Sequence, residues 1–315
     1  MTKRQARPAG GGRAATGIAA AALACALAFA PPAANAADSP LAGTVWTGAG
    51  EAVRFADIER AAAAADFVTI GEIHTNAEHH ANQARLVAAM AEAGRRPAVV
   101  LEMVPRSLQG ALDAFLAEET PDAAALGAAL AWERRGWPDW AIYRPIAETA
   151  LAAGLAMAAG DLDRDTIRAI GRGEAAPDGG PDYSEAMRER LGDEIRTAHC
   201  NLMPEQAIAP MIAVQQARDR AMADAMLSAG GDGAVLIAGD GHARADRGVP
   251  FVLGARAPGK TVVSVGQIEV TGEQTRFSDT LGEGETALPY DYVIFTTVSD
   301  DTDHCAALER RIGKD

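Results

Sequence analysis

The chain has 315 residues, of which 48% are apolar and only 5% aromatic, so we expect a core built mostly from Ala, Val, Leu and Ile. Its 43 acidic and 29 basic residues give a net charge of −14, which argues against a nucleic-acid-binding protein. After residue 36 there is no run of about 20 apolar residues, so no transmembrane helix is predicted.

The first 36 residues are typical of a secretory signal peptide. A basic start is followed by the apolar run Ile18–Ala30 and by the small-residue cleavage site Ala34–Ala36. We therefore predict cleavage near Ala36, export to the periplasm or the medium, and a single domain over residues 37–315. Lipidation of Cys25 is an alternative, but it is less favoured because the apolar run continues beyond that cysteine.

Two cysteines, Cys200 and Cys305, remain if Cys25 leaves with the signal peptide. An even pair in an oxidising compartment favours a disulfide that closes a long loop and holds the C-terminal tail. Two unpaired buried thiols are the alternative. The spacing fits no zinc pattern, and the absence of Cys-x-x-Cys-His excludes covalent c-type haem.

The amino-terminal part of the domain predicts a small edge hairpin within residues 37–56, then a helix over 57–65 capped by Asp57. The β-branched run Phe67–Ile70 predicts a buried strand. A helix follows from near Asn76 to about Gly94, and Thr75 with Glu78 has the form of a capping box at its start.

Between that strand and helix lies a turn, residues 71–75, which carries Glu72 and His74. In a parallel sheet such a turn lies at the carboxyl end of a strand, where ligands bind. His79 and His80 follow on the first helical turns, so three of the six histidines fall within seven positions.

The rest of the chain alternates apolar runs and helical patterns, which predicts an α/β protein with a mixed sheet. The predicted strands are 98–102, 155–159, 234–238, 262–265, 268–270 and 292–297, and the predicted helices are 105–117, 121–131, one ending at 153, 184–199, 204–227 and one from 306.

Three of the four tryptophans fall within residues 132–140. Such a cluster can fill a helix crossing, or it can offer a planar apolar surface to a large flat ligand. Three arginines flank it, and they would either bind anionic groups of such a ligand or simply face solvent (Arg134, Arg135 and Arg144).

Two turns have the form Gly-x-x-His, one ending at His74 and the other at His242, and each directly follows an apolar strand. With Glu72 and Glu102 at the same predicted sheet edge, these histidines could bind a metal or carry acid–base chemistry. A purely structural role is the alternative. The known zinc-helix motifs are absent, so a metal site would have to be assembled from separate strand ends.

Several separated motifs together resemble the ChaN-type haem-binding uptake family, which is related to the Tiki and TraB proteins and to erythromycin-esterase-like folds. The matching stretches are Val68–Gln83, Val100–Met103, Tyr143–Pro145, His199–Cys200, Gln215–Asp219, Gly239–His242, Gly248–Pro250 and Asp303–Cys305. They cover nearly all of the domain in order.

The resemblance implies a three-layer α/β/α fold with a mixed, mainly parallel central sheet and a role in haem or iron acquisition. It also implies haem as cofactor, bound as a cofacial pair in a homodimer with tyrosine as iron ligand, and an outer-membrane haem or iron transporter as partner. Tyr143 is the first candidate ligand, and a buried tyrosine with a bonded hydroxyl is the alternative. The other candidate haem-contacting residues are His79, His80, Trp137 and Arg144.

The related Tiki and TraB proteins imply a rival function, a metal-dependent hydrolase, which leaves open whether the protein is an enzyme. His74, His242 and either Glu72 or Glu102 would hold a divalent cation, and the other glutamate would activate water. Arg218 would stabilise the developing oxyanion. A third reading is a partner-binding module in which the His and Glu cluster is structural.

Overall fold

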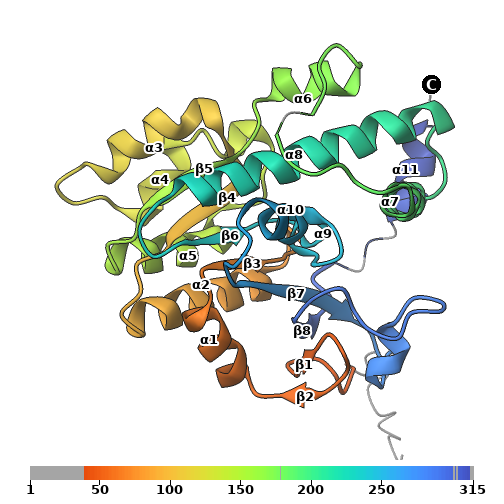
Figure 1. The fold of residues 1–315 in the computed structure, drawn as a ribbon, viewed down its shortest axis with the longest axis horizontal. Helices are drawn as coiled ribbons and strands as arrows, with labels where there is room; N and C mark the ends of the chain where they lie inside the picture. Colours follow the sequence, from red (N-terminus) through yellow and green to blue (C-terminus); the bar gives the residue numbers. More distant parts are fainter. Residues whose placement is uncertain (1–38, 178, 301, 303, 313–315) are drawn as a thin grey trace, which may run out of the picture. The chain divides into compact units, whose positions relative to one another are not determined.

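The structure is a computed structural model that describes residues 39–177, 179–300, 302 and 304–312 (Figure 1). The predicted signal peptide, its cleavage site and Cys25 lie outside the described residues. No helix in the described part of the chain is both long enough and apolar enough to cross a membrane.

The described strands form one mixed sheet in the order β2-β1-β8-β7-β3-β6-β4-β5. The strands are β1 (Val45–Thr47), β2 (Ala52–Val53), β3 (Phe67–Ile70), β4 (Ala98–Pro105), β5 (Met157–Asp161), β6 (Ala234–Ile237), β7 (Val262–Val270) and β8 (Tyr292–Thr297). All neighbours from β8 to β5 run parallel, and β1 is antiparallel to β2 and β8. The mixed, mainly parallel sheet is therefore confirmed.

Helices cover both faces of the sheet, which confirms the three-layer α/β/α architecture (Figure 1). The helices are α1 (Phe55–Ala64), α2 (Ala77–Glu92), α3 (Gln109–Leu116), α4 (Ala123–Ala129), α5 (Trp140–Ala152), α6 (Arg164–Gly171), α7 (Glu185–Ala198), α8 (Ile208–Ser228), α9 (Asp240–Ala243), α10 (Gly248–Arg256) and α11 (His304–Ile312). One apolar core joins the sheet to α1, α2, α4 and α5. A second core joins the other face to α8 and α10.

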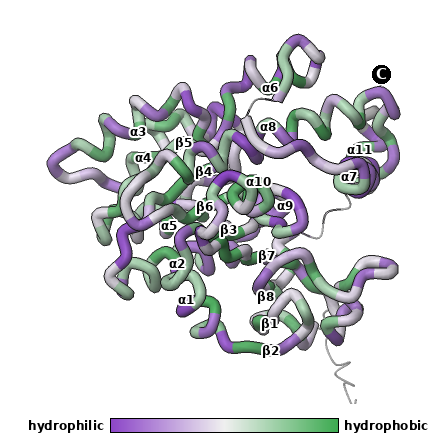
Figure 2. Tube along the Cα trace, viewed as in Figure 1, coloured by the Kyte–Doolittle hydropathy of each residue, from purple (hydrophilic) through white to green (hydrophobic). Residues whose placement is uncertain are grey.

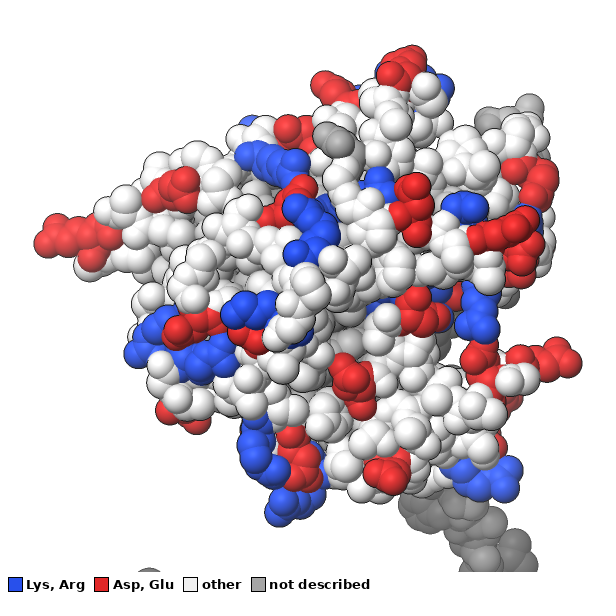
Figure 3. All heavy atoms as spheres, in the orientation of Figure 1, with Lys and Arg blue, Asp and Glu red and all other residues white. Residues whose placement is uncertain are grey.

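The central strands are apolar on both faces because helices bury both (Figure 2). Along β3, Val68 and Ile70 belong to the α1–α2 core, whereas Phe67 belongs to the α8–α10 core. The alternation follows from the two-residue period of a strand. On the face shown in Figure 3, acidic and basic side chains lie mixed.

The register of the central strands brings three strand ends to the same level. Ile70 of β3 pairs with Ile237 of β6, and Ile237 pairs with Leu101 of β4. The residues that follow these three positions therefore emerge side by side at the carboxyl edge of the sheet.

Two predicted helix starts were wrong in detail. Helix α1 begins at Phe55 with Arg54 as its N-cap, so Asp57 is the third helical residue and takes part in a capping box by accepting from the backbone N–H of Arg54 at 2.9 Å. Helix α2 is capped by the Asn76 side chain, which accepts from the N–H of Glu78 at 2.9 Å, so Thr75 is not its cap.

Other boundaries also differ from the prediction. Helices α6, α9 and α10 were not predicted, because they are short and lie in Gly- and Arg-rich sequence. The segments 262–265 and 268–270 form one continuous strand, β7, through Gly266. A Cβ at Gly266 would lie 2.6 Å from the ring of Tyr290, so this glycine makes room for a side chain and does not end the strand.

The predicted disulfide is present between Cys200 and Cys305, with a Cα–Cα distance of 5.6 Å. Cys200 and Asn201 both have positive φ, at 58° and 57°, so the chain turns sharply where α7 ends. The bond thereby fastens the tip of the α7–α8 hairpin to the carboxyl-terminal helix α11.

Candidate functional site

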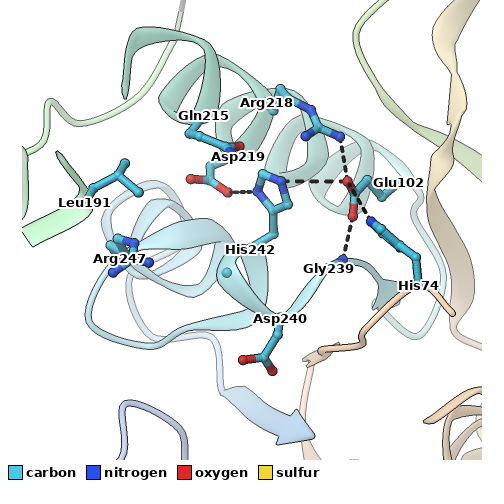
Figure 4. Close-up of a pocket in the computed structure, with 11 residues that line it drawn as sticks. His74, Glu102, Leu191, Gln215, Arg218, Asp219, Gly239, Asp240, His242 and Arg247 are labelled. Atoms are coloured by element: carbon cyan, nitrogen blue, oxygen red, sulfur yellow. Dashed lines mark hydrogen bonds and ion pairs between the residues drawn. The ribbon is translucent and has the colours of Figure 1, made fainter. Parts of the chain in front are cut away.

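A pocket of about 220 Å³ lies at the carboxyl edge of the sheet, between β3, β4, β6 and α8 (Figure 4). It contains both Gly-x-x-His histidines. The lining residues are His74, Glu102, Leu191, Gln215, Arg218, Asp219, Gly239, Asp240, Gly241, His242 and Arg247.

Glu102, in the second half of β4, is the carboxylate that the other polar side chains of the pocket surround (Figure 4). Its Oε1 accepts from Nη2 of Arg218 at 2.5 Å, and its Oε2 accepts from the backbone N–H of Gly239 at 2.5 Å. Burial would raise the pKa of Glu102, but the charge of Arg218, the charges of His242 and His74 and the Gly239 N–H together lower this pKa to about 2. Glu102 is therefore ionised at neutral pH.

Arg218 holds two carboxylates from neighbouring strands. Besides Glu102, it donates from Nε and Nη2 to Asp161 at the end of β5, at 3.0 and 2.7 Å. Desolvation works against its charge, yet the two carboxylates raise the pKa of Arg218 further. A buried cation shared by two anions fixes the relative positions of β4, β5 and α8.

His242 is oriented from behind by a carboxylate of α8. Its Nδ1 lies 2.6 Å from Oδ1 of Asp219, and the hydroxyl of Tyr183 donates to the other oxygen of Asp219. This contact places the Nδ1 proton toward Asp219 and leaves Nε2 directed at Oε1 of Glu102, 3.8 Å away. A carboxylate-oriented imidazole of this kind can accept a proton at Nε2.

His74 is held in the same way from the opposite side. Its Nδ1 lies 2.6 Å from Oε1 of Glu72, and its Nε2 lies 4.0 Å from Oε1 of Glu102. Burial would lower the pKa of His74, but the hydrogen bond to Glu72 and the charges of Glu102 and Glu72 together raise it. The side chain of His74 is 34% exposed, which is more than that of His242.

Glu72 is buried beneath the turn of residues 71–75 and accepts several hydrogen bonds. Tyr143 donates its hydroxyl to Oε1 at 2.6 Å, and Gln83 donates to Oε2 at 2.8 Å. His80 Nδ1 lies 3.2 Å from Oε2. Burial alone would raise the pKa of Glu72, but hydrogen bonds from His74 and His80 lower it.

Tyr143, the predicted iron ligand, is buried and its hydroxyl is engaged by Glu72. Burial raises the pKa of Tyr143, and the adjacent carboxylate raises it further, so the phenol stays protonated. This geometry does not fit iron ligation. It matches the alternative of a buried tyrosine with a bonded hydroxyl.

His79 and His80, two further candidate haem contacts, are fully buried at the start of α2. His79 accepts from the backbone N–H of Ile73 at 2.8 Å, and its Nε2 lies 2.8 Å from the hydroxyl of Thr296. Burial lowers the pKa of His79 to about 4. These histidines hold the turn from inside and present no surface to a haem.

The tryptophan cluster mainly fills a helix crossing. Trp132 is buried and donates to the carbonyl of Pro138 at 2.7 Å, and Trp140 donates to the carbonyl of Ala123 at 2.8 Å. Trp137 is partly exposed and meets the His74 ring edge-on at 5.0 Å. Arg144 is exposed and pairs with Glu148 on α5 at 3.0 Å.

Four of the five residues of the predicted hydrolase set line the pocket, and the fifth, Glu72, lies behind His74, but the set does not form a metal site. The described residues contain no group of three or more His, Cys, Asp and Glu side chains that could hold a metal ion. The reason is that Glu72 binds Tyr143 and Gln83 beneath the turn, whereas Glu102 is already bound by Arg218. The predicted metal set of His74, His242, Glu72 and Glu102 is not supported.

Sequence reasoning missed three residues that position the site. Asp161 ends a strand, which is the same signal that selected Glu102, and it could have been found on that ground. Asp219 directly follows Arg218, but only the packing of α8 shows that it faces His242. Tyr183 lies after a Gly- and Pro-rich stretch and carries no signal in the sequence.

A family model and one solved structure both point to the ChaN family. The family model described as "Haem-binding uptake, Tiki superfamily, ChaN" matches residues 58–253. ChaN of Campylobacter jejuni, in a structure described as cofacial heme binding, is 25% identical, with a TM-score of 0.66 over 79% of this chain and 95% of that chain. No curated protein matches the sequence.

Two other solved structures are more distant. The type III effector HopBA1 is 14% identical, with a TM-score of 0.47 over 84% of this chain and 98% of that chain. An erythromycin esterase mutant in its open conformation is 15% identical, with a TM-score of 0.41 over 81% of this chain and 83% of that chain.

Proposed function

Because the chain belongs to the ChaN family of haem-binding uptake proteins in the Tiki superfamily, we propose that it binds haem and serves iron uptake. The observation that carries the proposal is the family match over residues 58–253. The similarity to a ChaN structure with cofacial haem supports it, since that similarity spans 95% of the other chain. Because a shared fold does not establish a shared function, the family match is the stronger support.

The proposed site of action is the periplasm. The signal-peptide pattern of residues 1–36 and the disulfide between Cys200 and Cys305 both support export to an oxidising compartment. Lipidation at Cys25 is a less favoured variant of the same proposal. In this setting an outer-membrane haem or iron transporter would be the partner, and two copies would pair through their haems.

The pocket around Glu102 is not the proposed haem-binding site. Its volume of about 220 Å³ falls below the roughly 300–1,000 Å³ of pockets for drug-sized ligands, and a porphyrin is larger than most of these. Its two arginines are already paired, Arg218 with Glu102 and Asp161 and Arg247 with Glu194, so neither is free for a haem propionate. We therefore place haem on another surface of the chain.

A haem titration of the protein purified from the periplasmic fraction tests the proposal. We expect a saturable Soret band with hemin and a cleaved amino terminus near Ala36 by mass spectrometry. Tyr143→Phe should leave the Soret band unchanged, because the Tyr143 hydroxyl faces Glu72. Absence of saturable haem binding by the unmodified protein would rule the function out.

A second candidate function, acid–base hydrolysis of a small ester or amide, is favoured by one specific observation. His74 and His242 each have a carboxylate at Nδ1 and direct Nε2 toward the same pocket. His242 would take a proton from a water held beside Glu102, and Arg218 would stabilise the oxyanion that forms. This version needs no divalent cation.

Hydrolysis of p-nitrophenyl acetate, followed with and without EDTA, tests the second candidate. His242→Ala should abolish turnover, whereas His199→Ala at the end of α7, away from the pocket, should keep it. EDTA should change neither rate. Equal rates in the two variants would dismiss hydrolysis while leaving the haem proposal untouched.

A further inference from the structure

An apolar groove of about 460 Å³ lies between the end of α6 and the first half of α8, and we call it the α6–α8 groove. Two glutamines line it, Gln206 and Gln215, and its other lining residues are small or apolar: Gly171, Ala207, Pro210, Met211 and Val214. None of these described lining residues carries a ring system for stacking or a charge. Such a lining favours a flexible hydrocarbon chain over a flat or an ionic ligand.

The groove and the pocket at the sheet edge follow one another along α8. Met211, which lines the groove, and Arg218, which lines the pocket, lie on the same helix face as Gln215, which lines both (Figure 4). From Pro210 to Arg218 the helix advances about 12 Å. This length is comparable to that of an extended hydrocarbon chain of roughly eight to ten carbons.

The side-chain amide of Gln215 has an unused hydrogen-bonding group where the two cavities meet. Its Oε1 is buried and has no donor within the described residues. A buried acceptor without a donor is unfavourable, and an N–H group of a ligand would satisfy it. A secondary amide carries such an N–H next to its carbonyl carbon, whereas an ester has none.

A second groove, of about 380 Å³, lies beside the tryptophan cluster. It offers the rings of Trp132 and Trp140 and the guanidinium of Arg134, so it suits a flat ligand. It shares no lining residue with the pocket that holds His242. The α6–α8 groove is therefore the better site for the apolar part of a substrate whose reacting group lies in the pocket.

We propose that the substrate is an N-acyl amide whose straight hydrocarbon chain lies in the α6–α8 groove and whose carbonyl group lies in the pocket beside His242. This inference rests on the second candidate function, acid–base hydrolysis, and names its substrate class. The amide N–H donates to Oε1 of Gln215. Water attacks the carbonyl carbon and gives a proton to Nε2 of His242, which passes it to the nitrogen as the C–N bond breaks. The products are a carboxylic acid and an amine.

Hydrolysis of p-nitroanilides with acetyl, butyryl, hexanoyl and octanoyl groups tests the position of the chain. We expect kcat/KM to rise about two- to fourfold for each added methylene, because each one leaves water for the groove. Gly171→Leu should remove most of this rise. A Cβ at Gly171 would lie 3.7 Å from Cγ2 of Val214, an ordinary contact, so the variant should fold with its longer side chain in the groove.

Gly110→Leu is the matched control, because it makes the same change on another helix. Gly110 lies in α3, no atom lies within 4 Å of its Cβ position, and it does not line the groove. This variant should keep the full dependence of kcat/KM on chain length.

The p-nitrophenyl esters of the same acids test the amide, because they lack the N–H. Gln215→Leu removes the acceptor and keeps a side chain of similar size. We expect it to lower kcat/KM for the octanoyl anilide about tenfold or more relative to kcat/KM for the octanoyl ester. Gly110→Leu should leave this ratio as it is in the unmodified protein.

The outcomes separate the substrate from the reaction. If chain length has no effect, or if Gly171→Leu keeps the full effect, the chain does not lie in the groove and the inference is overturned while hydrolysis stands. If only the esters are hydrolysed, or if Gln215→Leu slows both classes equally, the amide is wrong and the inference is likewise overturned. If no substrate is hydrolysed faster than by His242→Ala, both the inference and the second candidate function are overturned.

Discussion

Removing the disulfide should destabilise the protein strongly, because the bond closes a long loop. Cys200 and Cys305 are 105 positions apart, and for a loop of about 100 residues the chain-entropy model gives about 4.7 kcal/mol. That is a large part of the roughly 5–15 kcal/mol that stabilises a typical domain. The perturbation to make is the double change Cys200→Ser and Cys305→Ser in the chain that begins at residue 37, which leaves no free thiol.

Urea unfolding at pH 7, followed by circular dichroism, measures the effect. We expect the midpoint to fall and the m-value to rise, because an uncrosslinked unfolded chain exposes more surface. The unmodified protein in reducing agent should match the double variant. A loss below about 1 kcal/mol with an unchanged m-value would refute the reasoning, since the tail would then restrict the unfolded chain very little.

Three further predictions concern the pocket edge. Gly71→Ala should lower the free energy of unfolding by about 1–3 kcal/mol, because its Cβ would lie 2.3 Å from Oδ1 of Asp240. Gly241→Ala is the control and should be nearly neutral, because no atom lies within 4 Å of its Cβ. Thermal melts of the two variants check this, and equal melting temperatures would contradict it. The folded-state pKa of Glu102 is about 2, below its usual 4.5, so its contribution to the free energy of unfolding is complete above about pH 4.5 and is lost as the pH falls toward 2. Glu102→Gln should therefore flatten the acid side of a curve of stability against pH. An unchanged acid side would count against the pairing of Glu102 with Arg218. Asn76→Ala should lower the free energy of unfolding by about 0.5–2 kcal/mol, because it removes the side chain that caps α2. Thr75→Ala is the control, and a larger loss of stability in that variant would mean that Thr75 is the cap.

The sheet and the meeting of the two Gly-x-x-His turns were predictable from the sequence. Both turns follow short apolar runs, and parallel strands deliver such turns to one edge. What the sequence could not give is the order of the strands. β3 and β6 are far apart in the chain but adjacent in the sheet, and this adjacency is what brings His74 and His242 to the two sides of Glu102.

The direction of each side chain was less predictable. Tyr143 sits in an aromatic region that could have been open to a ligand, and only the packing of α5 on α2 shows that its hydroxyl points to Glu72. The same holds for Asp219, because its position after Arg218 in the sequence does not indicate its partner. Its carboxylate instead serves His242, because α8 faces α9 across the pocket.

Gln215 lines two separate cavities of the molecule. One is the pocket at the sheet edge, and the other is the α6–α8 groove, an apolar groove of about 460 Å³ between the end of α6 and the first half of α8. The Oε1 of Gln215 has no hydrogen-bond donor within the described residues. A molecule that enters either compartment therefore meets the same amide, and a guest on one side limits the rotamers open to the other. Titrations of the two compartments should consequently be run together, since a measured affinity for one belongs to a stated occupancy of its neighbour.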